Sequence, residues 1–297
     1  MSPQMQERHM DYVWSFPTIA AGEKFVAPFQ FDPDASFALR GLAARVPYDA
    51  AGTQQGLQFV SLRWSGPTED YRQERPVPVG LMMGPYFGQY GNPKPVFPQV
   101  VYPASGITWL EVWNNGAAPV VGLQVFFRGV KLGFPGQWNQ PTYPAKMRSE
   151  RYSYPFTVPN LAVTDDGPHV NQVFRVKPNG DFVFRAGQAG RSFAPQTFEV
   201  FMTLRDFDKY AYSNLPVHVD VLFGQSIGRA AYPCGGAGLF IAPVGPGASA
   251  PGLMYPEIYL PADHLMLYDI YRFDAAYQGA AMADFPMNFI GSKVVPA

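Results

Sequence analysis

An internal repeat constrains this 297-residue chain more than any other feature of its sequence. Blocks of the first half recur in the same order in the second half, and their spacing changes only between blocks. Residues 97–103 (FPQVVYP) match residues 255–261 (YPEIYLP), and Gly129 matches Gly291. We therefore expect two copies of one domain, because each half carries the same pattern of apolar and turn residues.

Charged positions are repeated as well. The matched positions are Arg40 and Arg185, Arg63 and Arg205, and Glu111 and Asp269. An arginine kept in both copies indicates a structural contact at the rim of each domain, and the matched acids are its candidate partners. The alternative is a pair of equivalent sites for an anionic ligand.

The expected secondary structure is β throughout. The 31 prolines and 29 glycines disfavour helices, because proline lacks the amide donor and glycine adds an entropic cost. Residues 217–223 (VHVDVLF) alternate with the period of two that is typical of a half-buried strand. About eight short strands per copy predict two tandem β-sandwich domains, jelly-roll-like, while immunoglobulin-like connectivity stays open.

The predicted boundaries follow from the ends of the repeat. They are an N-terminal arm (1–14), a first sandwich (15–132), a Pro- and aromatic-rich linker (133–155), and a second sandwich (156–297) with a long loop (225–254). We expect the arm and the long loop to contact other chains. The candidate interface residues are Tyr12, Trp14, Tyr232 and Phe240.

The search for catalytic chemistry favours a protein that is not an enzyme and carries no metal or cofactor. The four histidines do not recur between the copies, and His218 with Asp220 lacks a third metal ligand. Cys234, the single cysteine, has no neighbouring base or cation that would activate its thiol. The paired carboxylates at 165–166 and at 206 and 208 read as turn residues.

Charge and targeting signals narrow the partners. The net charge is −1 and no Lys/Arg cluster is present, which argues against nucleic acid. No apolar segment indicates a signal peptide or a membrane span. The low content of charged residues, 15%, favours burial against other subunits in a homo-oligomer.

Three blocks resemble virion structural proteins of tailed bacteriophages. They are residues 182–190 (FVFRAGQAG), 211–224 (AYSNLPVHVDVLFG) and 255–261. The resemblance implies a capsid-decorating (cement), collar or tail component that binds other virion proteins and is assembled in the host cytoplasm. It carries over no functional residue.

Two other functions compete with this interpretation. A receptor- or carbohydrate-binding module would stack sugars on exposed aromatic side chains. Its candidate residues are Trp64, Tyr86, Phe87, Tyr90 and Trp138. A double-barrel cupin enzyme also duplicates a β-sandwich, but it needs a histidine-rich metal cluster that this sequence does not repeat.

Overall fold

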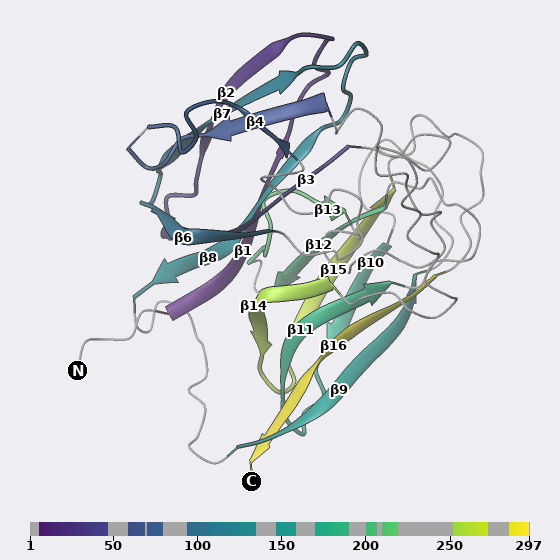
Figure 1. The fold of residues 1–297 in the computed structure, drawn as a ribbon. Coiled ribbons are helices and arrows are strands. Elements are labelled where there is room, and N and C mark those ends of the chain that lie inside the picture. The colour runs from purple at the N-terminus through teal and green to yellow at the C-terminus, as the bar shows by residue number, and fades with distance from the viewer. Residues whose placement is uncertain are drawn as a thin grey trace, which may run out of the picture.

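The computed structural model describes ten stretches of the chain: 6–46, 59–68, 70–79, 94–134, 147–158, 170–189, 200–206, 210–218, 252–272 and 285–296. They contain sixteen strands in four antiparallel sheets (Figure 1). The predicted fold class, two tandem β-sandwiches, is confirmed. No helix in these stretches has the length and apolar character needed to cross a membrane.

The first domain is an eight-stranded jelly roll. Its strands are β1 (Gln6–Ser15), β2 (Lys24–Gln30), β3 (Ser36–Arg45), β4 (Val60–Trp64), β5 (Val77–Pro78), β6 (Lys94–Tyr102), β7 (Ile107–Asn114) and β8 (Gln124–Gly133). They form sheets of order β1-β8-β3-β6 and β2-β7-β4-β5. The chain changes sheet at every step except from β4 to β5, which is jelly-roll connectivity.

The second domain repeats this topology. Its strands are β9 (Met147–Val158), β10 (Val170–Arg175), β11 (Asp181–Ala189), β12 (Val200–Asp206), β13 (Val217–His218), β14 (Gly252–Leu260), β15 (Leu265–Arg272) and β16 (Phe285–Pro296). Their orders, β9-β16-β11-β14 and β10-β15-β12-β13, match those of the first domain strand for strand. The structure therefore settles the open choice of connectivity in favour of the jelly roll.

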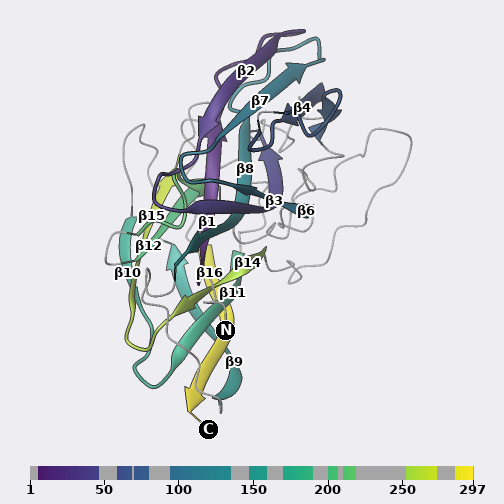
Figure 2. The same cartoon turned by 90° about the vertical axis from the view of Figure 1, so that its left-hand side faces the viewer.

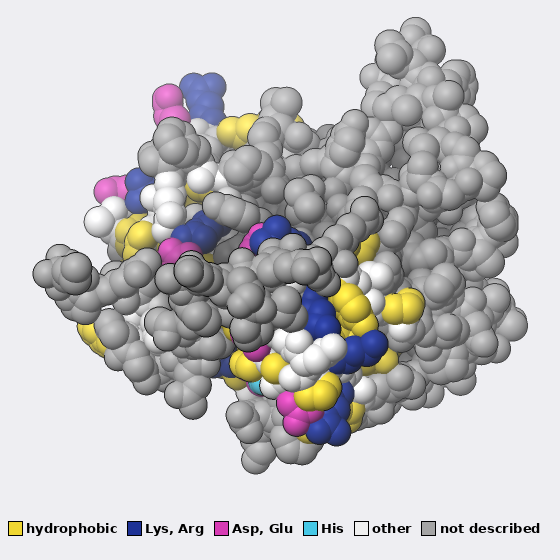
Figure 3. Space-filling view, turned by 90° about the horizontal axis from the view of Figure 1, so that it is seen from below, with side chains coloured by type: hydrophobic (Ala, Val, Ile, Leu, Met, Phe, Trp, Pro, Cys, Tyr) yellow, Lys and Arg dark blue, Asp and Glu magenta, His cyan; other side chains and the backbone are white. Residues whose placement is uncertain are grey.

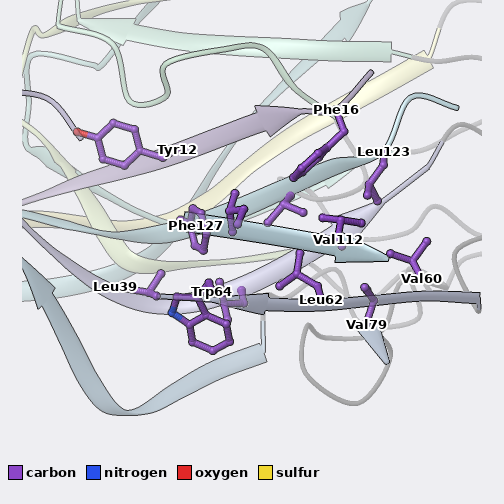
Figure 4. Packing of buried hydrophobic residues seen from close by; sticks show 14 of the residues in the cluster. Tyr12, Phe16, Leu39, Val60, Leu62, Trp64, Val79, Val112, Leu123 and Phe127 are labelled. Carbon is purple, nitrogen blue, oxygen red and sulfur yellow. The ribbon is translucent and has the colours of Figure 1, made fainter. Parts of the chain in front are cut away.

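A tyrosine from the first strand anchors each core. Tyr12 meets the ring of Phe37 edge-on at 4.9 Å, and Tyr154 meets Phe182 in the same way at 4.9 Å. In both domains the hydroxyl also accepts a backbone N–H from the turn between the second and third strands, at 3.3 and 3.0 Å. Tyr12 belongs to the buried cluster that also contains Trp64 and Phe127 (Figure 4).

The repeated glycines fit this core. A Cβ atom on Gly129 would lie 2.1 Å from the carbonyl oxygen of Ala38, and one on Gly291 would lie 2.0 Å from that of Val183. These distances leave no room for a side chain, so glycine is required where β8 and β16 pair with the third strand of their domains, beside its β-bulge.

The domain boundaries differ from the expected ones. Residues 6–15 are not a free arm, because they pair with β8 along their whole length as strand β1. Residues 147–155 of the expected linker belong to β9, and residues 252–254 of the expected long loop belong to β14. Sequence matching began only at the second strand of each copy, so it missed the equivalent strands β1 and β9.

Candidate functional site

The junction between the domains combines apolar, backbone and charged contacts. It is made by the outer face of sheet β1-β8-β3-β6. Val13 and Phe126 point from this face into the core of the second domain, while their neighbours Tyr12 and Phe127 point into the core of the first. Strands β1 and β8 are therefore buried on both faces along most of their length, and they lie between the second domain and sheet β2-β7-β4-β5 (Figures 1 and 2).

The edge of β1 is completed by residues 210–214 of the second domain. The N–H of Asp11 donates to the carbonyl of Tyr212 at 2.8 Å, and the N–H of Asn214 donates to the carbonyl of Asp11 at 3.2 Å. The Asn214 side chain accepts from the N–H of Val13 at 2.6 Å and donates to its carbonyl at 3.0 Å. The middle of this edge is therefore closed against pairing with another strand.

A buried ion pair lies on the same face. Asp11 receives two hydrogen bonds from Arg128, at 2.9 and 2.8 Å, and lies 3.4 Å from His9; all three side chains are almost fully buried. Burial alone would raise the pKa of Asp11, but Arg128 and His9 hold it well below its usual range. A bidentate, fully enclosed pair of this kind fixes the orientation of both side chains. Removing either partner leaves the charge of the other buried without compensation.

A second polar cluster joins the domains beside the first. Asp206 forms an ion pair with Arg8, accepts a hydrogen bond from the Tyr212 hydroxyl at 2.7 Å and lies 3.0 Å from His264 Nε2. Burial would raise the pKa of Asp206, but His264, Tyr212 and Arg8 together lower it. The Arg8 guanidinium also lies over the ring of Tyr210, 3.1 Å from its centre, so one arginine engages two second-domain residues.

Packing at the junction is close. The cavity that it contains is no larger than about one water molecule. Its lining includes His9 and Asp11 from β1 and Met202, Tyr212 and Ser213 from the second domain. Shared core residues, paired backbone and buried charges thus hold the two jelly rolls as one body.

The matched charges of the first domain lie on the outer face of sheet β2-β7-β4-β5. Arg63 reaches Glu111 at 2.8 Å, Lys24 lies 3.2 Å from the same carboxylate, and the indole N–H of Trp113 donates to it at 2.7 Å. Burial would raise the pKa of Glu111, but these three groups lower it. The ion pair is structural, because its carboxylate is enclosed by its own partners.

The second domain has an ion pair at the equivalent place, with a different register. Arg205 lies 2.7 Å from Asp269, but the residue directly opposite Asp269 is Thr203. Arg63 stands directly opposite Glu111, so its structural counterpart is Thr203 and not Arg205. The sequence match between these two segments is thus shifted by two residues from the structural equivalence. Arg205 still reaches its acid, because residues two apart share a face.

Arg40 and Arg185, in contrast, are equivalent in the structure. Each is the extra residue of a β-bulge, between Leu39 and Gly41 in β3 and between Phe184 and Ala186 in β11. Each forms an ion pair on the surface. The distances are 2.5 Å from Arg40 to Glu7 and 3.1 Å from Arg185 to Glu257. The repeated arginines therefore mark a bulge that both domains share.

The expected interface residues are placed differently. Tyr12 is buried in the first core, and Trp14 packs against Phe16 and Phe29 inside the same domain. Both side chains lie on the inner face of β1 because strand residues alternate between faces. Tyr232 and Phe240 lie outside the described residues.

Other candidates from the sequence can be placed only in part. Trp64, a candidate for sugar stacking, is buried in the core, and His218 ends the short strand β13. The remaining aromatic candidates, Cys234 and the acids at 165, 166, 208 and 220 lie outside the described residues. Within the described stretches, no three His, Cys, Asp or Glu side chains gather as metal ligands would.

Sequence reasoning missed the residues that build the junction. Asp11 and Arg128 stand opposite one another in β1 and β8, and the corresponding pair in β9 and β16 is Ser153 and Ile290. The signal was therefore a charged pair present in only one copy. A search for repeated residues does not detect such a pair, because only the first copy turns the outer face of this sheet towards the other domain.

The fold defines the chain as a tandem pair of jelly rolls. No family model matches it, and no curated protein matches it. Solved structures with some similarity include the infectious bursal disease virus VP2 subviral particle (7% identity, 100% of this chain, 73% of that one, TM-score 0.28). A second is the structure of Sulfolobus Turreted Icosahedral Virus (13% identity, 97% of this chain, 91% of that one, TM-score 0.25). A third is a peptide-N(4)-(N-acetyl-β-D-glucosaminyl) asparagine amidase (11% identity, 96% of this chain, 96% of that one, TM-score 0.24). Two of these three come from virus particles and one is an enzyme, and TM-scores this low carry no argument about function.

Proposed function

We propose that this chain is a non-enzymatic structural subunit of a virus particle, which acts by binding neighbouring subunits. The observation that carries the proposal is the domain junction. A building block must present its outer surfaces at fixed angles, and the doubly buried strands β1 and β8 with the two polar clusters hold the two domains in this way. Jelly rolls occur in capsid proteins, but also in lectins and cupins, so the fold alone is an analogy.

The resemblance of three blocks to virion proteins of tailed bacteriophages gives the proposal its specific form. In that form the protein is a capsid-decorating cement, a collar component or a tail component, assembled in the host cytoplasm. Its partners are other virion proteins and further copies of itself, without nucleic acid, membrane or cofactor.

The test is whether the protein belongs to a particle. Antibodies raised against the purified full chain should label particles in electron micrographs of a lysate from the source, and the protein should sediment with them. A protein found only in the particle-free fraction, and binding sugars on a glycan array, would instead favour the receptor- or carbohydrate-binding alternative.

A further inference from the structure

The outer face of sheet β2-β7-β4-β5 exposes large apolar side chains. Val26 on β2 and Ile107 and Trp113 on β7 are all more than a third exposed, and they point away from the core. In Figure 1 this sheet lies on the side of the first domain remote from the second. Exposed aromatic and aliphatic groups next to arginine are typical of protein interfaces. We call this surface, with Lys24 and Arg63, the outer sheet face.

The charges on this face have a fixed arrangement. Glu111 is only 1% exposed, whereas the Lys24 side chain above it is 44% exposed. Arg63, the second partner of Glu111, is also partly exposed. The negative charge of Glu111 is therefore enclosed, and its two partners present cationic groups to the solvent. The carboxylate is already paired, so docking would not have to desolvate an unpaired acid.

A second surface of the same domain has the opposite arrangement. Lys131 is 4% exposed and lies 2.7 Å from Asp32 and 2.8 Å from Asp34, whose side chains are 43% and 45% exposed. Here the cation is enclosed and carboxylates are offered. We call this surface the acidic end. Figure 3, seen from below, shows that acidic and basic side chains lie next to one another on the described surface.

We propose that the acidic end of one copy docks on the outer sheet face of the next copy. This inference rests on the proposed function and names the partner of that function, a second copy of this chain. The two surfaces are complementary in charge, and both belong to one domain, so every copy carries both halves of the contact. Because two different patches meet, the contact is heterologous and builds rings or filaments, not closed two-fold dimers.

The experiment measures self-association of the purified full chain by sedimentation velocity, over a range of protein concentration at low and high salt. Lys24→Glu and Asp34→Lys should each weaken association roughly tenfold, and the two together should restore most of it because the charges are exchanged. Val26→Ser removes exposed apolar surface without changing any charge, and it should weaken association as well. Arg175→Glu reverses an exposed charge in the second domain and should leave association unchanged. Melting curves establish that each variant is folded.

The outcomes separate this proposal from the proposed function. Weakening by the single changes with restoration by the exchanged pair supports the docking. Association that is unaffected by all three surface variants overturns it, and self-assembly through another surface would leave the proposed function standing. A wild-type protein that joins particles only through an unrelated protein also overturns the docking alone. A wild-type protein that stays monomeric and joins no particle overturns both.

Discussion

The buried pair of Asp11 and Arg128 gives the sharpest prediction about the junction. Asp11→Asn keeps the size of the side chain but removes the charge that faces Arg128, and both side chains are 2–3% exposed. Removing one partner of an enclosed ion pair costs about 3–5 kcal/mol, because the other charge stays buried without compensation. A domain is stable by only about 5–15 kcal/mol, so the change should remove a large fraction of the stability of the junction.

Urea denaturation of the full chain, followed by tryptophan fluorescence, measures this loss. The matched control is Asp263→Asn, which breaks an exposed ion pair with Arg175 and should leave the midpoint where it is. Asp11→Leu combined with Arg128→Met should recover most of the lost stability, since a well-packed apolar pair can replace a buried ionic one. The reasoning is refuted if Asp11→Asn lowers the midpoint no more than Asp263→Asn does.

Three further predictions follow from the same structure. Gly129→Ala and Gly291→Ala should each lower the melting temperature sharply, because the new Cβ would meet a carbonyl oxygen at about 2 Å; equal melting of variant and wild type would contradict this. Asn214→Ala should weaken the coupling of the domains by about 1–3 kcal/mol, since it leaves the N–H and carbonyl of Val13 unpaired, and hydrogen exchange at Val13 should rise. Acid should destabilise the junction, because the pKa values of Asp11 and Asp206 are lower in the folded protein than in the unfolded chain. The stability that these two carboxylates contribute is present above about pH 4 and is lost as the pH falls through their folded pKa values. A series of urea midpoints at decreasing pH should therefore decline, and a constant midpoint would contradict the prediction.

The fold could be predicted from the sequence because both copies carry the residues that each core requires. Gly129 and Gly291 recur because a Cβ atom fits in neither place, and Arg40 and Arg185 recur because both domains keep the same bulge. Such positions report on the interior of one domain, and they are what comparison of two copies detects.

The junction could not be predicted in this way. Only the first domain turns its sheet towards the other, so Asp11 and Arg128 have no charged counterparts in the second copy. The register of Arg205 was missed for a related reason. A shift of two residues keeps each side chain on the same face of the strand and preserves the pattern of apolar residues. Sequence alone therefore cannot decide whether Thr203 or Arg205 is the residue equivalent to Arg63 in the second copy.

The burial of β1 and β8 on both faces has a consequence for biosynthesis. The N-terminal domain leaves the ribosome first and has its own complete core, whereas the C-terminal domain needs Val13 and Phe126 to fill its interior. The first domain thus supplies a folded sheet surface on which the core of the second domain packs. We therefore expect the domains to fold in the order in which they are synthesised. A C-terminal half made by itself would lack the part of its core that Val13 and Phe126 provide.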